Sequence, residues 1–292
     1  MQILVTGAGG FIGNYFAHHL TLDGHTVFAT YRNTLPEGIS GDSEINLVKA
    51  DLCGNEPLPA PLDAIVHCAA DHPSTMEENQ QLFDNNALSI QHLCQHANSS
   101  GVYNIIHCSS MSVYGQVMTN YINEETESVS PGQYGLSKLY AEKHIDEWVK
   151  SGNDRSATSI RLPGVVGKNS HGNFLSSVVE SIRQGKNIVA HSPDAEFNNI
   201  VHVKDLYGFI KLLLEKKTGT HEITNIAATN PMPLGKILDM IIKLSGKNAH
   251  IQYQDTNRKP FLISLDKVQS LGYKPQSVKR SIECLVADKI EN

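Results

Sequence analysis

Short apolar runs recur along the first half of the chain, separated by stretches with helical periodicity. Near-continuous runs of this kind are typical of strands buried on both faces of a parallel sheet. Six of them predict strands at residues 2–7, 26–30, 45–50, 64–70, 103–110 and 157–162. Two longer stretches, 76–100 and 134–151, have apolar residues at every third or fourth position and predict helices. This alternation predicts an α/β fold with a doubly wound parallel sheet.

The pattern becomes irregular in the second half, where Gly, Asn and Pro cluster between shorter apolar runs. We expect a first α/β domain over residues 1–163, with residues 199–228 returning to its sheet. The remaining segments, 164–198 and 229–292, predict a smaller C-terminal lobe that binds the substrate. The chain therefore reads as two parts of unequal size.

Composition and charge narrow the class of partner. The net charge of −6 gives no electrostatic case for a nucleic acid or an anionic membrane, so a small-molecule substrate is the better expectation. None of the fourteen histidines has metal-ligand spacing, and we expect no metal. The five cysteines are scattered, and no apolar run is long enough to span a bilayer. With a strand starting almost at Met1, we expect a cytoplasmic protein.

A glycine-rich turn follows the first strand. The sequence "TGAGGFIG" places Gly7, Gly10 and Gly13 between a strand and a helix, with Phe11 and Ile12 at the start of that helix. Gly7 permits a tight turn, Gly10 lets the backbone approach a pyrophosphate, and Gly13 lets helix and strand pack closely. The helix N-terminus attracts phosphate. The turn predicts a Rossmann fold that binds a dinucleotide at these five residues.

A candidate catalytic group combines a strand end with a helix start. Tyr134 and Lys138 are four residues apart, so their side chains share one helix face. A nearby ammonium and an oxidised nicotinamide would lower the phenol pKa toward the working pH, as a proton donor and acceptor requires. Ser110, at the end of the preceding strand, is placed to hold a substrate oxygen. Tyr-x-x-x-Lys alone is common on helix surfaces. The prediction therefore depends on the order of three motifs along the chain: the glycine turn, the strand that ends in serines and the helix with Tyr134 and Lys138.

These motifs together are similar to a known family. The residues that carry the likeness are "TGAGGFIG", "DL" at 51–52, "HCAA" at 67–70, "DNNA" at 84–87, "SSMSVYG" at 109–115, "YGLSK" at 134–138, "IRLPGVVG" at 160–167 and "IVHVKDL" at 200–206. The chain resembles the extended short-chain dehydrogenase/reductases, the NAD-dependent epimerase/dehydratase family of nucleotide-sugar enzymes. The resemblance implies that Tyr134 is the acid/base, that Lys138 binds the nicotinamide ribose and lowers the phenol pKa, and that Ser110 binds the reacting oxygen.

The resemblance implies further binding residues. Asp51 and Leu52 would lie at the adenine, Ala69 along the cofactor and Asn86 behind the active site. The remaining candidates are Ser109 for the cofactor and, for the substrate, Ser112, Asn198 and Arg258 beside Ser110.

Two departures from the family pattern narrow the activity. The 4,6-dehydratases carry Thr-Asp-Glu at the strand end, whereas this chain has Ser110-Met111-Ser112, which cannot supply their acid and base. A dehydratase is therefore disfavoured. In members resembling UDP-galactose 4-epimerase an Asp stands at the position of Tyr31 and would repel a 2′-phosphate. This chain has Tyr31 at that position and Arg32 directly after it. The Arg32 guanidinium can bind a phosphate, so NADP(H) is favoured over NAD(H).

A third departure concerns the substrate. Epimerase-like members contact the sugar-nucleotide diphosphate through an Asn and an Arg where this chain has Gly164 and Asn198. Arg258, Lys259 and Lys168 are alternative cations for that contact. A nucleotide sugar remains the expected substrate class.

The leading hypothesis is an NADPH-dependent reductase of a keto-sugar nucleotide, such as an NDP-4-keto-6-deoxyhexose. The alternatives are a nucleotide-sugar 4-epimerase, a reductase of a small non-nucleotide carbonyl, and a non-catalytic NADP-sensing protein. We also expect the helices at 76–98 and 134–150 to form a homodimer by four-helix packing.

Overall fold

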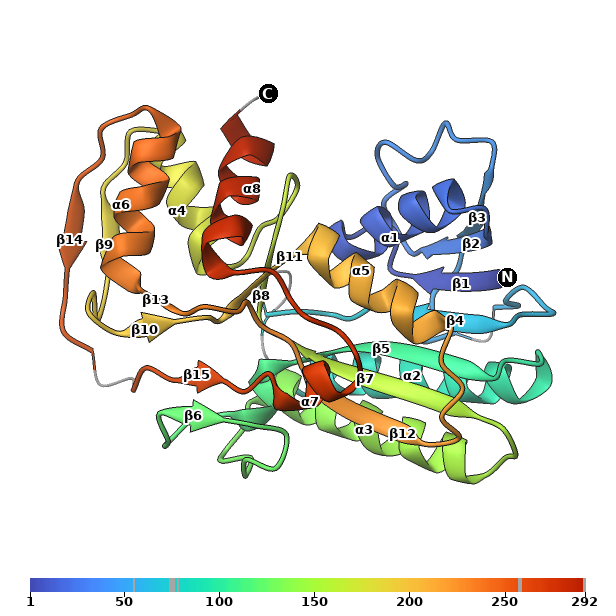
Figure 1. Cartoon of the computed structure of the whole chain (residues 1–292). Coiled ribbons are helices and arrows are strands. Elements are labelled where there is room, and N and C mark those ends of the chain that lie inside the picture. The colour runs from blue at the N-terminus through green and yellow to red at the C-terminus, as the bar shows by residue number, and fades with distance from the viewer. Residues whose placement is uncertain (55, 74–76, 78, 257–258, 291–292) are drawn as a thin grey trace. The chain divides into compact units, whose positions relative to one another are not determined.

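The six predicted strands, joined by a seventh, form the central sheet of a computed structural model of the chain (Figure 1). The structure describes residues 1–54, 56–73, 77, 79–256 and 259–290. The strand order is β12-β7-β5-β4-β1-β2-β3. The strands are β1 (Gln2–Thr6), β2 (Thr26–Tyr31), β3 (Ile45–Lys49), β4 (Ala64–His67), β5 (Asn104–Ser110), β7 (Ser156–Leu162) and β12 (His221–Asn225). Strands β5, β4, β1, β2 and β3 pair in parallel. The expected doubly wound Rossmann fold is confirmed.

Two compact units make up the chain. Unit 1 comprises Met1–Gly115, Ser130–Arg161 and Ile210–Thr224, and unit 2 comprises Gln116–Val129, Leu162–Phe209 and Asn225–Asn292. Residues 116–129, expected in the first domain, belong to unit 2, where strand β6 (Tyr121–Ile122) pairs with β15 (Leu262–Ile263). Because that pairing joins residues far apart in the sequence, local pattern could not predict it.

Three helices of unit 1 cover the sheet: α1 (Phe11–Leu22), α2 (Gln80–Ser99) and α3 (Gln133–Lys150). Helices α2 and α3 pack against each other. Their inward faces, including Ile90, Leu93, Ile145 and Trp148, form one buried cluster with sheet residues such as Ile65. Since the helices alternate apolar and polar positions with helical period, the buried stripe faces the sheet. The start of α3 is thereby held at the carboxyl end of the strands.

Unit 2 has a second core. Helices α4 (Phe174–Arg183), α6 (Leu234–Ser245) and α8 (Val278–Ile290) contact one another. Val179, Ile237 and Ile282 are fully buried among them. Short strand pairs complete the unit: β8 (Gly164–Val166) with β11 (Ile200–His202), β9 (Ile188–Ala190) with β14 (Ile251–Tyr253), and β10 (Glu196–Phe197) with β13 (Met232–Pro233). The other elements are η1 (Met111–Tyr114), α5 (Val203–Leu214), which runs from unit 2 into unit 1, and α7 (Asp266–Ser270).

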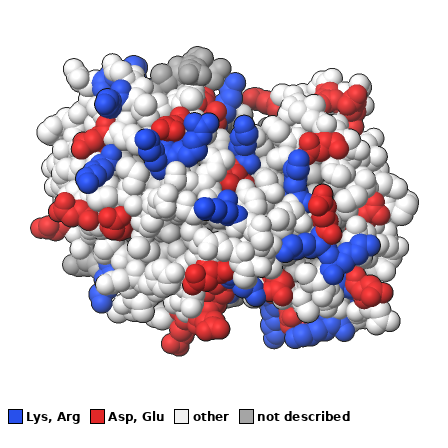
Figure 2. All heavy atoms as spheres, in the orientation of Figure 1, with Lys and Arg blue, Asp and Glu red and all other residues white. Residues whose placement is uncertain are grey.

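The surface carries mixed charge. On the face drawn in Figure 2, basic and acidic side chains are interspersed. Within the described part of the chain, no helix has the length and hydropathy needed to cross a membrane.

Candidate active site

The glycine turn connects β1 to α1 and is packed tightly against β4. Gly7 has φ +73°, and a Cβ there would lie 2.8 Å from the backbone of Ala69. A Cβ on Gly13 would lie 2.4 Å from the carbonyl oxygen of Gly7. Gly10 is the N-cap of α1 and makes no side-chain hydrogen bond to the first N–H groups of that helix. The turn therefore fits a bound phosphate, with Phe11 and Ile12 in the first turn of the helix.

A cavity of about 360 Å³ opens beside this turn. The carboxyl ends of β1, β2 and β4 and one face of α2 line it. Of the predicted cofactor residues, the cavity is lined by Gly7, Gly10, Arg32, Asp51, Leu52, Ala69 and Asn86. Its position, at the carboxyl ends of parallel strands, is where α/β sheets bind dinucleotides. These residues fit an adenosine and pyrophosphate group.

Arg32 is paired across this cavity with an acid that the sequence analysis did not single out. Its guanidinium Nη2 lies 3.0 Å from Oδ1 of Asp71. The other carboxylate oxygen of Asp71 accepts a hydrogen bond of 2.7 Å from the Asn85 side chain. The Arg32 side chain is 46% exposed and that of Asp71 12%. Because β2 and β4 both adjoin β1, the pair bridges the two strands that flank the glycine turn.

Asn86 lies behind this loop, where the resemblance placed it. Its side-chain oxygen accepts from the Asp71 backbone N–H at 2.8 Å, and its amide nitrogen donates to the Asp71 carbonyl at 3.1 Å and to Ser137 Oγ at 3.0 Å. Asn86 therefore ties the loop after β4 to helix α3. These hydrogen bonds are expected for a buried asparagine, because its polar atoms need partners.

Tyr134, Lys138 and Ser110 come together at the start of α3. The Lys138 Nζ lies 5.6 Å from the centre of the Tyr134 ring and donates to the carbonyl oxygen of Cys108 at 2.8 Å. A hydrogen bond joins the Ser110 and Tyr134 side chains. A Cβ on Gly135 would lie 2.2 Å from the Ser112 carbonyl oxygen, so only glycine permits this close approach of α3 to η1. The predicted arrangement of the three side chains is present.

The electrostatics differ from the sequence-based expectation at Tyr134. Burial, and then the neighbouring Cys108, raise the pKa of Tyr134 above its usual value, against a smaller lowering by Ser110. Burial lowers the pKa of Lys138 to about 8. The expected lowering of the Tyr134 pKa by the Lys138 ammonium is therefore wrong for the protein itself, because burial outweighs the groups that favour the phenolate.

Ser109 is buried and turned toward the helix. Its hydroxyl donates to Glu142 Oε1 at 2.6 Å, and Glu142 forms a bidentate ion pair with Arg161 at 3.1 and 2.8 Å. Arg161 also donates to the Tyr114 hydroxyl at 3.0 Å. This use of Ser109 is a positioning role, whereas the resemblance assigned it to the cofactor.

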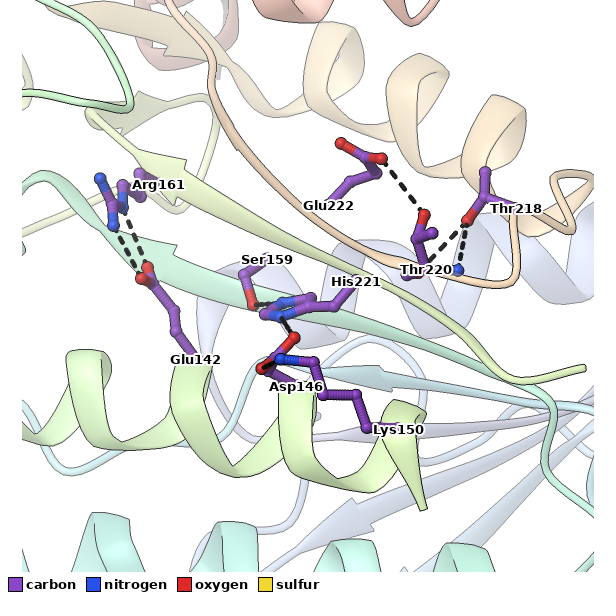
Figure 3. A network of polar contacts seen from close by, with 9 residues as sticks. All are labelled: Glu142, Asp146, Lys150, Ser159, Arg161, Thr218, Thr220, His221 and Glu222. Carbon is purple, nitrogen blue, oxygen red and sulfur yellow. Dashed lines mark hydrogen bonds and ion pairs between the residues drawn. The ribbon is translucent and has the colours of Figure 1, made fainter. Parts of the chain in front are cut away.

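A second polar chain holds the same helix to the sheet (Figure 3). The His221 ring lies 2.9 Å from Ser159 Oγ and 3.8 Å from Asp146, which pairs with Lys150 at 2.6 Å. Together with the Glu142–Arg161 pair, these contacts join α3 to β7 and β12. Helix α3, and with it Tyr134 and Lys138, is therefore fixed along its length.

His72 is a further residue of this site that the sequence analysis missed. Its ring meets the Tyr134 ring edge-on, with centroids 4.7 Å apart. It follows the "HCAA" strand end by two residues, and side chains at the carboxyl end of a parallel strand reach the site edge. Its position just after a strand end could have identified His72 from the sequence.

The remaining substrate candidates differ in their position relative to Ser110. Ser112 is exposed in η1, and its N–H donates to Ser110 Oγ at 3.1 Å. Asn198 is buried in unit 2, where its carboxamide makes two hydrogen bonds, of 2.9 and 3.0 Å, with the Ile263 backbone. Arg258 lies outside the described residues.

The fold is that of a dinucleotide-binding α/β protein, and Ser110, Tyr134 and Lys138 lie together at its candidate active site. The model of the NAD dependent epimerase/dehydratase family matches residues 3–227. The chain belongs to that family. This confirms the resemblance and the expected class, an enzyme of the extended short-chain dehydrogenase/reductase type.

Several relatives align over nearly the whole chain. A dTDP-4-dehydro-6-deoxy-D-allose reductase from Streptomyces sp is 25% identical, over 96% of this chain and 94% of the relative. A UDP-glucose 4-epimerase from Lactobacillus helveticus is 25% identical, over 84% and 82%. Among solved structures, a UDP-N-acetylglucosamine 4-epimerase from Methanobrevibacter ruminantium M1 has a TM-score of 0.85 at 19% identity, over 98% and 96% of the two chains. That likeness confirms the fold.

Proposed function

We propose that this protein is an NADPH-dependent reductase of a keto-sugar nucleotide, with a 4-keto-6-deoxyhexose as the sugar. The observation that carries the proposal is the position of the Tyr134 phenol, which is hydrogen-bonded to Ser110 and has the Lys138 Nζ 5.6 Å from the centre of its ring. A reductase needs an acid that is protonated when the carbonyl is reduced. The Streptomyces relative, a reductase of a dTDP-4-dehydro-6-deoxy sugar by name, supports the same substrate class.

Each of the three side chains has a defined role in the proposed reduction. Ser110 donates a hydrogen bond to the substrate carbonyl and holds it against the phenol. Tyr134 transfers its proton to that oxygen as the carbonyl carbon is reduced. Lys138 binds the nicotinamide ribose, and its charge stabilises the phenolate that remains. The cofactor, when bound, supplies the hydride.

Arg32 supports the preference for NADPH. It lines the cavity at the end of β2, where an acid would bind the ribose of NAD(H). Its guanidinium can instead contact a 2′-phosphate in bidentate fashion. A net reduction consumes its cofactor, which suits a dedicated NADPH pool. Titration of the protein with NADPH and with NADH separates the two cofactors.

The proposal divides the work between the two units. Unit 1 binds the cofactor, and unit 2 contributes to substrate binding. Asn198 is not proposed as a diphosphate contact, because its carboxamide is hydrogen-bonded to the Ile263 backbone. Ser112, at the exposed start of η1, is the proposed sugar contact of unit 1.

A 4-epimerase is the second candidate, because a UDP-glucose 4-epimerase is among the relatives. The two are separated by incubating the purified protein with NADPH and a dTDP-4-keto-6-deoxyhexose. The reductase consumes one NADPH for each sugar reduced, and NADH serves poorly. Epimerisation of UDP-glucose without consumption of NADPH would establish the second candidate.

The proposal includes a homodimer built on α2 and α3. Their outward faces carry Leu88 and Leu136, each 40% exposed. Two helices from each subunit would give a four-helix contact. Sedimentation should give a dimer at micromolar concentration, and Leu136→Glu should shift it toward monomer. A monomer before any substitution would refute this part.

A further inference from the structure

Two thiols meet at the floor of the cofactor cavity. Cys68 follows β4 directly and Cys108 lies in β5; the register pairs His67 with His107, so these cysteines come next on adjacent parallel strands. Their Sγ atoms are 3.6 Å apart. Adjacent strands lie about 4.8 Å apart, inside the Cα range of disulfides, about 4.4–6.8 Å. A shortening of about 1.6 Å between the sulfurs would make the bond.

One thiol of the pair is accessible and the other is activated. Cys68 is partly exposed and lines the cavity, whereas Cys108 is buried. The hydrogen bond to Cys108, followed by burial, raises the pKa of Cys68 despite the Lys138 ammonium, which donates to the Cys108 carbonyl at 2.8 Å. Accepting the hydrogen bond from Cys68 lowers the pKa of the Cys108 thiol. The thiolate form is the nucleophile in thiol oxidation.

The other cysteines lack this arrangement. The Cys53 thiol donates to the carbonyl oxygen of Asn85 at 3.3 Å. Cys94 is buried in the apolar cluster between α2, α3 and the sheet, and burial raises its pKa to about 12. All five cysteines are free thiols in the structure.

We propose that Cys68 and Cys108 are an oxidisable dithiol that a peroxide reaches through the cofactor cavity and converts into a disulfide. One thiolate attacks an oxygen of hydrogen peroxide, the O–O bond breaks, and a sulfenic acid and hydroxide form. The second thiolate attacks the sulfenic sulfur, the S–S bond forms and a second hydroxide leaves. The two thiol protons convert both hydroxides to water. Two thiols are thereby oxidised, and one peroxide is reduced to two waters.

The disulfide would act on the active site. It draws together the ends of β4 and β5, and the Cys108 carbonyl that holds Lys138 moves with them. Cys68 also adjoins Ala69, whose N–H is held by Thr6 Oγ1 at 3.1 Å behind the glycine turn. Oxidation should therefore lower turnover, and a dithiol reductant should restore it. A dinucleotide in the cavity should cover Cys68 and slow the oxidation.

The test treats the full-length protein with hydrogen peroxide, blocks the remaining thiols after unfolding, and maps the peptides. The thiol count should fall from five to three, with a bond between Cys68 and Cys108. Cys108→Ser should form no such bond, and the matched core variant Cys94→Ser should form it as the original protein does. Five remaining thiols, a different pairing, or sulfinic acid on Cys68 or Cys108 without a disulfide would overturn the proposal.

The predicted protection by a dinucleotide rests on the proposed function. Repeating the oxidation with saturating NADPH therefore tests the dithiol and the cofactor site separately. Slower bond formation supports both. A disulfide that forms equally fast with NADPH present leaves the dithiol established and contradicts the assignment of the cavity to the cofactor.

Discussion

The two ends of the proposed cofactor site in unit 1 are built differently. At the catalytic end, Tyr134 is 8% and Lys138 4% exposed, and helix α3 is fixed by buried polar contacts. At the adenosine end, the Arg32 side chain is 46% exposed and is held by one acid from another strand end. Buried groups keep one geometry, whereas an exposed ion pair contributes about 0–1 kcal/mol and rearranges easily. We therefore expect the geometry of the catalytic side chains to exist before the cofactor binds. The choice between NADPH and NADH should depend on an ion pair that rearranges easily.

The largest effect is expected at Tyr134. Tyr134→Phe keeps the ring and its contact with His72 but removes the transferable proton. Turnover should fall by about 10²–10⁴, the usual contribution of general acid catalysis, while NADPH binding survives. Steady-state kinetics and cofactor titration check this. Tyr140→Phe, on the same helix, is the matched control, and near-normal turnover of Tyr134→Phe would show that the acid is another group.

The next effect is expected at Lys138. Lys138→Met should lose rate and NADPH affinity together, because one side chain serves the phenol and the ribose; Lys143→Met, exposed on the same helix, should lose neither. The pKa of Lys138 is lowered to about 8, so its charge is present below that pH and is lost above it. The kcat/KM for NADPH should therefore decline as pH rises through about 8. A decline that persists unchanged in Lys138→Met would assign it to another group.

A smaller effect is expected at Arg32. Arg32→Ala should weaken NADPH binding by about 1–3 kcal/mol, the range for a hydrogen bond to a charged group, and leave NADH binding nearly unchanged. Isothermal titration with both cofactors measures the difference. Equal affinities of the original protein for NADPH and NADH would contradict the assignment.

The smallest effect is expected at Asp71. Asp71→Asn keeps a polar partner for Asn85 but removes the charge that competes with a 2′-phosphate for Arg32. NADPH affinity should rise severalfold, and NADH affinity should change little. Asp84→Asn, on the exposed face of α2, controls for net charge. Weaker NADPH binding in Asp71→Asn would mean that Asp71 holds Arg32 in its binding position.

The sequence predicted the elements whose signals are local. The strands, the glycine turn and the Tyr134–Lys138 face depend on spacing within one element or one turn, and the fold follows from them. Pairing between distant segments was not predictable: Asp71 meets Arg32 from 39 residues away, and Ser109 turns to Glu142. Asn198 was assigned to a diphosphate by position, but its bonds to Ile263 depend on a fold contact between residues 65 apart. Ends of parallel strands, as at His72, are where such contacts should be sought.

The most direct test of the proposed reduction follows the hydride itself. NADPH carrying deuterium at the transferable position of nicotinamide C4 is incubated with the enzyme and a dTDP-4-keto-6-deoxyhexose, and the sugar is analysed by mass spectrometry and NMR. The proposed reduction predicts one deuterium at C4 of the sugar for each NADP⁺ formed. In Tyr134→Phe the sugar should be labelled much more slowly. An unlabelled sugar with its configuration changed and no net oxidation of NADPH would contradict it.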